Sequence, residues 1–141
     1  MKPGRYYVDS NIVIYRASDV ELLTAEVKAI LKDTCNYIYV PSKCVEELIY
    51  LQQSGRIEVK PWKSAEDIIG YIKTELRYEI KYVVEEHLQT LARLPLFPDH
   101  KDPTDRIAIA QAITERIPII SSDRQFHDYK RSGLEFIYNK R

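Results

Sequence analysis

Short runs of β-branched and aromatic residues alternate with helix-patterned segments along the chain, and this alternation restricts the possible folds more than any other feature. Predicted strands cover residues 5–8, 37–40, 78–83, 117–120 and 134–138. Runs of this length and composition are typical of short buried strands. Because strands that alternate with helices need crossover connections, the sequence predicts an α/β fold with a parallel sheet and helices on both faces.

The segments between these strands have apolar residues at three- and four-residue steps, which is typical of helices. Predicted helices cover residues 19–33, 42–53, 64–77, 85–93, 103–115 and 124–130. Ser42 and Ser64 are predicted N-caps, and Pro103 suits the first position of its helix. The third strand is placed near Tyr78 because the helical pattern there gives way to a dense β-branched and aromatic run.

The size of the chain predicts one domain over residues 1–141. Lys and Arg together number 21, as do Asp and Glu, so the formal net charge is zero. This balance argues against a protein that coats nucleic acid with a broad basic face. It leaves open how the charges are distributed over the surface.

No apolar run approaches the ~18 residues that a membrane-spanning helix needs. The N-terminus has no apolar signal region, so we expect a cytoplasmic protein. The two cysteines, Cys35 and Cys44, have no CxxC motif or Cys/His cluster near them, so neither a zinc site nor a disulfide is predicted.

Four carboxylates fall where an open parallel sheet binds ligands, beyond the carboxyl ends of its strands. Asp9 follows the first strand and Asp123 the fourth, while Glu47 and Asp105 lie in the helices after the second and third strands. With the strand order 3-2-1-4-5, these four side chains converge on one crevice at the point where the strand order reverses.

Each of these acids also has a structural explanation. Asp9, Asp102 and Asp123 are natural helix N-caps, Asp105 can act in a capping box, and Glu47 can lie on a solvated helix face. Together, however, four clustered acids repel one another unless a cation lies between them. Oxygen donors without a His or Cys partner suit Mg²⁺ or Mn²⁺, and such a site suits phosphodiester hydrolysis.

The segments around these carboxylates resemble the PIN-domain family, and in particular the VapC-like toxin ribonucleases of type II toxin–antitoxin pairs. The matching segments are residues 7–11, 42–48, 100–112 and 121–126, in an order and spacing that cover nearly the whole chain. The resemblance implies a three-layer α/β/α domain with a five-stranded sheet, and Mg²⁺- or Mn²⁺-dependent cleavage of RNA. It also implies frequent homodimers and a small antitoxin whose C-terminal segment covers the active site.

By this resemblance the metal-binding and catalytic acids are Asp9, Glu47, Asp105 and Asp123, with Asn11 and Ser121 as polar support. Glu47 is preferred to Glu46 because the family's acid is followed by an aliphatic residue and stands five positions after the serine. Asp102 is mainly a cap, with a water-mediated role at the metal as the alternative.

Three further residues near these segments have open roles. Arg106 and Arg124 each follow a predicted metal-site acid, so they either contact RNA phosphates or an acidic group of an inhibitor, or pair with neighbouring carboxylates. His100 precedes the third acid in a loop, and we expect a structural role for it rather than general acid catalysis.

Other functional classes remain as alternatives. A PIN domain in RNA processing and a non-catalytic RNA- or protein-binding module share the fold, although the complete acid set argues against the second. A phosphate-accepting signalling domain or phosphatase needs an Asp-x-Asp arrangement, whereas Asp9 is followed by Ser10 and Asn11. No glycine-rich phosphate loop is present in the sequence, which argues against nucleotide hydrolysis.

Overall fold

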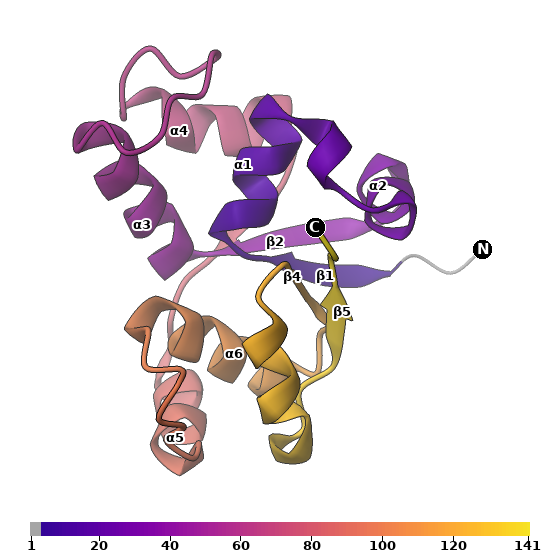
Figure 1. The fold of residues 1–141 in the computed structure, drawn as a ribbon, viewed down its shortest axis with the longest axis vertical. Helices are drawn as coiled ribbons and strands as arrows, with labels where there is room; N and C mark the ends of the chain where they lie inside the picture. Colours follow the sequence, from indigo (N-terminus) through magenta and orange to yellow (C-terminus); the bar gives the residue numbers. More distant parts are fainter. Residues whose placement is uncertain (1–3) are drawn as a thin grey trace.

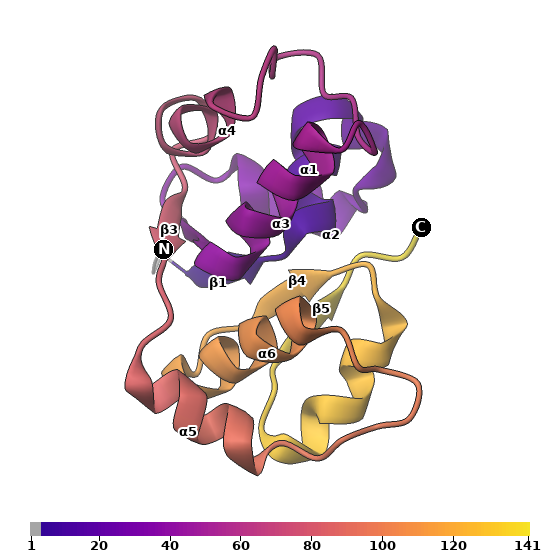
Figure 2. The ribbon, with the colours of Figure 1, turned by 90° about the vertical axis from the view of Figure 1, so that its left-hand side faces the viewer.

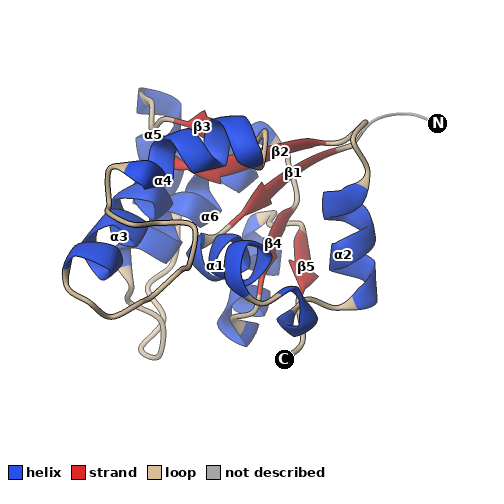
Figure 3. Cartoon of the chain, turned by 90° about the horizontal axis from the view of Figure 1, so that it is seen from above, coloured by secondary structure: helices blue, strands red, loops and turns tan. Residues whose placement is uncertain are grey.

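The first strand lies at the centre of a five-stranded parallel sheet with the order β3-β2-β1-β4-β5, which confirms the predicted order. In the computed structural model, which describes residues 4–141, β1 (Arg5–Val8) pairs with β2 (Tyr37–Pro41) on one side and with β4 (Ile119–Ser121) on the other. The edge strands are β3 (Glu79–Lys81) and β5 (Phe136–Tyr138). Figure 3 shows the five strands side by side in this order.

Helices cover both faces of the sheet and give the predicted three-layer α/β/α arrangement (Figures 1 and 2). One layer contains α1 (Ser10–Ser18), η1 (Val20–Leu22), α2 (Ala25–Lys32), α3 (Ser42–Gln53), α4 (Asp67–Gly70) and the π-helical turn η2 (Tyr71–Glu75). The other layer contains α5 (Glu85–Arg93), α6 (Pro103–Glu115) and the 3₁₀ helix η3 (Arg124–Ser132). The chain changes layer after β3, so the strand order reverses between β1 and β4.

The core fills the spaces between the sheet and the two helical layers. Adjacent residues of β1, Tyr7 and Val8, are both fully buried, as expected for a central strand covered on both faces. On the α6 side, Ile109 and Phe126 are also fully buried. Among residues 4–141, no helix is both long and apolar enough to cross a bilayer.

The prediction of one helix over residues 19–33 is wrong. Helix α1 begins directly after β1, because the Asp9 carboxylate accepts the backbone N–H of Ile12 and caps the helix. The chain then forms the short η1 and becomes extended at Leu23, and α2 begins only after its own cap, Thr24.

The predicted caps Ser42 and Ser64 are also wrong. Helix α3 begins at Ser42 itself, after Pro41, without a side-chain cap. The helix predicted from residue 64 begins at Asp67, whose own carboxylate accepts the N–H groups of Lys63 and Ser64. It then continues into the π-helical turn, and the strands β3, β4 and β5 are shorter than the predicted segments.

Candidate metal centre

Asp9 and Asp123 follow the neighbouring central strands β1 and β4 at the carboxyl edge of the sheet. Asp9 is only 5% exposed, and its Oδ1 atom accepts the N–H of Ile12 at 3.2 Å. Asp123 caps η3 through the N–H of Gln125, and its own N–H donates to the hydroxyl of Ser121 at 3.0 Å. Both acids are therefore helix caps, and both also lie where the strand order reverses.

Asp105 and Glu47 reach the same edge from helices of opposite layers. Asp105 lies in the first turn of α6, which Asp102 caps by accepting the N–H of Thr104 at 2.9 Å. Glu47 lies half-buried on α3, and α3 packs against α6 across the sheet edge. The neighbouring Glu46 is exposed and pairs with Lys43 at 3.1 Å, so of the two glutamates Glu47 is the one oriented inward.

The four carboxylates are close enough to change one another's protonation. Burial, with the charges of Glu47 and Asp123 added, raises the pKa of Asp9 to about 6. Burial and four neighbouring carboxylates raise the pKa of Asp105 to about 8. Carboxyl groups are thus crowded at this point, and a divalent cation would relieve both the desolvation and the repulsion of their ionised forms.

His100 lies inside this acidic group, which the sequence did not predict. Its ring is 3% exposed, and Nε2 lies 3.2 Å from Oδ2 of Asp105 and 3.4 Å from Oδ2 of Asp123. The Nδ1 atom lies 2.9 Å from the hydroxyl of Tyr129. The expectation that the acids have no histidine partner is therefore wrong.

The donor set fits a divalent cation. His100, Asp105 and Asp123 each offer one ligand atom, and these atoms lie within 4.8 Å of one another. Carboxylate oxygens suit Mg²⁺ and Mn²⁺, and they bring the charge that such an ion needs.

The two arginines of the predicted site differ in their surroundings. Arg106 donates to the carbonyl of Pro95 at 2.8 Å and to the hydroxyl of Tyr129 at 3.4 Å. Within residues 4–141 its hydrogen bonds thus go to a carbonyl and a hydroxyl group, and it forms no ion pair with a neighbouring carboxylate. Arg124 is exposed next to Asp123.

A shallow cleft of about 950 Å³ adjoins Asp123. Its lining combines polar side chains with three cations, namely Asn11, Ser122, Asp123, Arg124, Gln125, Tyr138, Lys140 and Arg141. The predicted support residue Asn11 is exposed there, whereas Ser121 is fully buried behind Asp123. Asp123 is the predicted acid that lines this cleft, beside the three cations.

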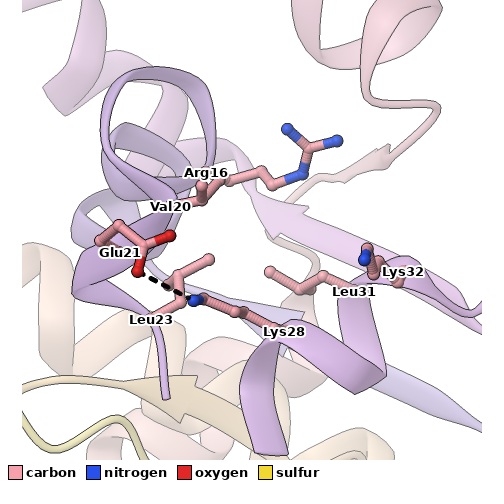
Figure 4. Close-up of a pocket in the computed structure, with 7 residues that line it drawn as sticks. All are labelled: Arg16, Val20, Glu21, Leu23, Lys28, Leu31 and Lys32. Atoms are coloured by element: carbon pink, nitrogen blue, oxygen red, sulfur yellow. Dashed lines mark hydrogen bonds and ion pairs between the residues drawn. The ribbon is translucent and has the colours of Figure 1, made fainter. Parts of the chain in front are cut away.

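A second pocket, of about 330 Å³, contains none of the predicted site residues. Figure 4 shows its lining, which includes the ion pair between Lys28 and Glu21 at 3.5 Å. It lies beside α1 and α2, in the layer opposite α6. The predicted site residues therefore lie at the carboxyl edge of the sheet and not in this pocket.

Comparison with known proteins agrees with this arrangement. The family model of the PIN domain matches residues 6–132, so the chain belongs to the PIN domain family. No curated protein matches the sequence. Several solved structures share the fold of this chain.

Similar solved structures include proteins from three bacteria. VapBC2 from Rickettsia felis, bound to a DNA fragment from its promoter, is 16% identical with a TM-score of 0.65, covering 96% of this chain and 99% of that chain. VapBC-1 from nontypeable Haemophilus influenzae is 15% identical with a TM-score of 0.64, covering 95% and 97%. FitAcB from Neisseria gonorrhoeae is 14% identical with a TM-score of 0.64, covering 95% and 96%. At these identities the likeness concerns the fold.

Proposed function

We propose that this protein is a Mg²⁺- or Mn²⁺-dependent endoribonuclease that hydrolyses RNA phosphodiester bonds. The observation that carries the proposal is the convergence of one buried and three half-buried acids at the point where the strand order reverses, with the pKa of Asp9 and Asp105 raised to about 6 and about 8. A protein rarely gathers such acids without a cation to offset their repulsion.

In this proposal Asp9, Glu47, Asp105 and Asp123 hold the cation and are the catalytic acids. A bound divalent cation lowers the pKa of a water molecule and stabilises negative charge on a phosphate oxygen. The hydroxyl of Ser121 accepts the backbone N–H of Asp123 and so fixes the position of that acid. Asn11 lies exposed at the cleft, where an amide can bind the substrate.

RNA would approach along the cleft beside Asp123. Arg124, Lys140 and Arg141 line it, and their charges suit the phosphates on either side of the cleaved bond. Arg106 is bound to Pro95 and Tyr129, so we assign it a role in supporting the site and not in binding RNA. Asp102 acts as the cap of α6, which orients Asp105.

The biological setting that we propose is a toxin–antitoxin pair. The support is the likeness in fold to VapBC complexes and to FitAcB. A small antitoxin and a homodimer would accompany this role, and cellular RNA as the substrate would place the protein in the cytoplasm. A PIN domain that processes RNA without an antitoxin is the alternative setting, and the gene neighbourhood distinguishes the two.

The test is cleavage of a panel of tRNA, rRNA and mRNA fragments by the purified protein with Mg²⁺ or Mn²⁺, compared with Asp9→Asn. We expect defined cleavage products from the wild-type protein, their loss in EDTA, and a rate at least about 100-fold lower for the variant. Equal cleavage by the two proteins, or cleavage that EDTA does not affect, would overturn the proposed function. RNA binding without cleavage would favour a non-catalytic module.

A further inference from the structure

We propose that His100 is itself a ligand of the divalent cation, through Nε2, so that the centre has a mixed nitrogen and oxygen donor set that favours Mn²⁺ over Mg²⁺. This inference rests on the proposed metal centre and deepens it. The sequence pattern supplied only oxygen donors, and the nitrogen donor is visible only in the fold.

The first support is the spacing of the donor atoms. Ligands on adjacent corners of an ion with bonds of about 2.1 Å are about 3.0 Å apart in an octahedron and about 3.4 Å apart in a tetrahedron. The Nε2 atom of His100 lies 3.2 Å and 3.4 Å from Oδ2 of Asp105 and Asp123. These separations match neighbours in one coordination shell.

The alternative is a hydrogen-bonded clamp, in which one N–H of His100 holds both carboxylates. A single N–H points well at only one acceptor, and only the Asp105 contact has hydrogen-bond geometry, whereas Asp123 is at ion-pair distance. A clamp of this kind also leaves the charges of Asp9 and Glu47 without a partner. A shared cation accounts for the positions of His100, Asp105 and Asp123, whose ligand atoms lie within 4.8 Å of one another.

The second support is the environment of the other ring nitrogen. A histidine that binds a metal usually donates its second N–H to a fixed acceptor, which sets the tautomer and the ring orientation. The Nδ1 atom of His100 lies 2.9 Å from the hydroxyl of Tyr129, and Arg106 donates to the same hydroxyl at 3.4 Å. A phenol oxygen has two lone pairs, so it can accept from both and leave the Nε2 lone pair directed at the acids.

The third support is the rigidity of the ring. His100 is 3% exposed, and its ring packs edge-on against Phe126 and Tyr129, with centroids 5.7 Å and 5.4 Å away. A ring held in this way presents Nε2 to Asp105 and Asp123 before any ion arrives. Imidazole suits first-row transition ions better than Mg²⁺, so this nitrogen shifts the selectivity of the centre towards Mn²⁺.

The test uses Mn²⁺ as a paramagnetic probe of the full chain. We expect pulsed EPR of the Mn²⁺-loaded protein to show coupling to a ¹⁴N nucleus, which changes to the ¹⁵N pattern when the histidines are ¹⁵N-labelled. His100→Gln should abolish the coupling, lower the Mn²⁺ affinity at least about tenfold, and lower the Mg²⁺ affinity less. Tyr129→Phe should keep the coupling but weaken Mn²⁺ binding about tenfold.

His127→Gln is the matched control. His127 is exposed and packs against Phe136 and Tyr138, away from the acids, so both the coupling and the affinity should remain. Absence of nitrogen coupling in the wild-type protein, or its persistence in His100→Gln, would overturn the proposal. Absence of coupling from the wild-type spectrum overturns the proposal even if a variant fails to fold.

These outcomes are separate from those of the cleavage assay. Nitrogen coupling without RNA cleavage keeps the ligand assignment and removes the proposed activity. Metal-dependent cleavage without nitrogen coupling keeps the activity and removes His100 from the ligand set.

Discussion

Asp105 illustrates how one half-buried acid couples metal binding to stability. Burial and nearby carboxylates raise its pKa to about 8 and that of Asp9 to about 6, from unfolded values near 3.9. The folded chain without metal therefore binds more protons than the unfolded chain between about pH 4 and pH 8. The free energy of unfolding accordingly falls as the pH rises through this window.

We predict that Asp105→Asn flattens this pH dependence. Because an amide carries no charge, the variant in EDTA should gain roughly 3 kcal/mol in free energy of unfolding at pH 8, and much less at pH 5. Urea unfolding at the two pH values measures the difference. A metal-free wild-type protein with the same stability at pH 5 and pH 8 would contradict the expected fall in the free energy of unfolding with rising pH.

Glu47 and Glu46 form an adjacent pair for a second prediction. Glu47→Gln removes a charge that faces Asp9 and Asp105, and we expect about 10- to 100-fold weaker Mn²⁺ binding. Glu46→Gln removes an exposed charge paired with Lys43 and should leave the affinity unchanged. Equal effects in a Mn²⁺ titration would remove Glu47 from the centre.

The sequence predicted the acids of the candidate centre but not the histidine that lies beside them. Asp9 and Asp123 end strands, so the strand order alone brings them to one edge. His100 lies in a loop and is fixed by Tyr129, which comes 29 residues later in η3. A contact of this kind depends on tertiary packing, and no local periodicity indicates it.

Among the elements, α6 was the easiest to predict and α1 the hardest. Helix α6 carries its N-cap Asp102 and Pro103 in the sequence, and both have these positions in the structure. In α1 the run Ile12 to Tyr15 is apolar on successive residues, so it has no helical stripe to recognise. Asp9 ends a strand and caps a helix at the same residue, which hides the boundary between them.

A buried polar cluster connects α5 and α6 to the sheet on the side away from the acids. The Glu115 carboxylate accepts the hydroxyl of Tyr7 at 2.7 Å, lies 2.8 Å from Nε2 of His87 and lies 3.6 Å from the ammonium of Lys81. Because the N–H of Val84 donates to Nδ1 of His87, Nε2 is the donor to Glu115. The cluster therefore connects two helices with β1 and β3.

We predict that Glu115→Ala lowers the free energy of unfolding by about 2–3 kcal/mol, because it leaves buried donors without an acceptor. Glu79→Ala removes the other acid near Lys81, at 3.8 Å, but that carboxylate is 64% exposed, so the loss should stay below about 0.5 kcal/mol. Chemical denaturation of the two variants gives the comparison. Similar losses would show that the buried network contributes little.

At the scale of the whole molecule, a net charge of zero conceals a strong local separation. Acids gather at the carboxyl edge of the sheet, and Arg124, Lys140 and Arg141 line the adjoining cleft. The composition gives the net charge, but the separation of acidic from basic side chains depends on which parts of the chain the fold brings together.

We predict that the double variant Arg124→Ala/Lys140→Ala raises the KM for RNA more than it lowers kcat. The slope of log KM against log salt concentration should fall by about 2, which is about 1 for each lost phosphate contact. The matched control, Lys28→Ala/Lys32→Ala, removes two charges beside the other pocket and should change neither quantity. A salt dependence that stays the same in the cleft variant would place RNA elsewhere.

The position of β4 between β1 and β5 also bears on how the protein is made. β1 emerges from the ribosome before its partner β4, and the acid Asp123 follows Asp9 only after more than a hundred further residues. A nascent chain that ends before β4 has Asp9 without its neighbour, so it has no assembled centre. Synthesis from the N-terminus therefore delays the assembly of this centre until β4 and Asp123 have been made, and products truncated before β4 lack it.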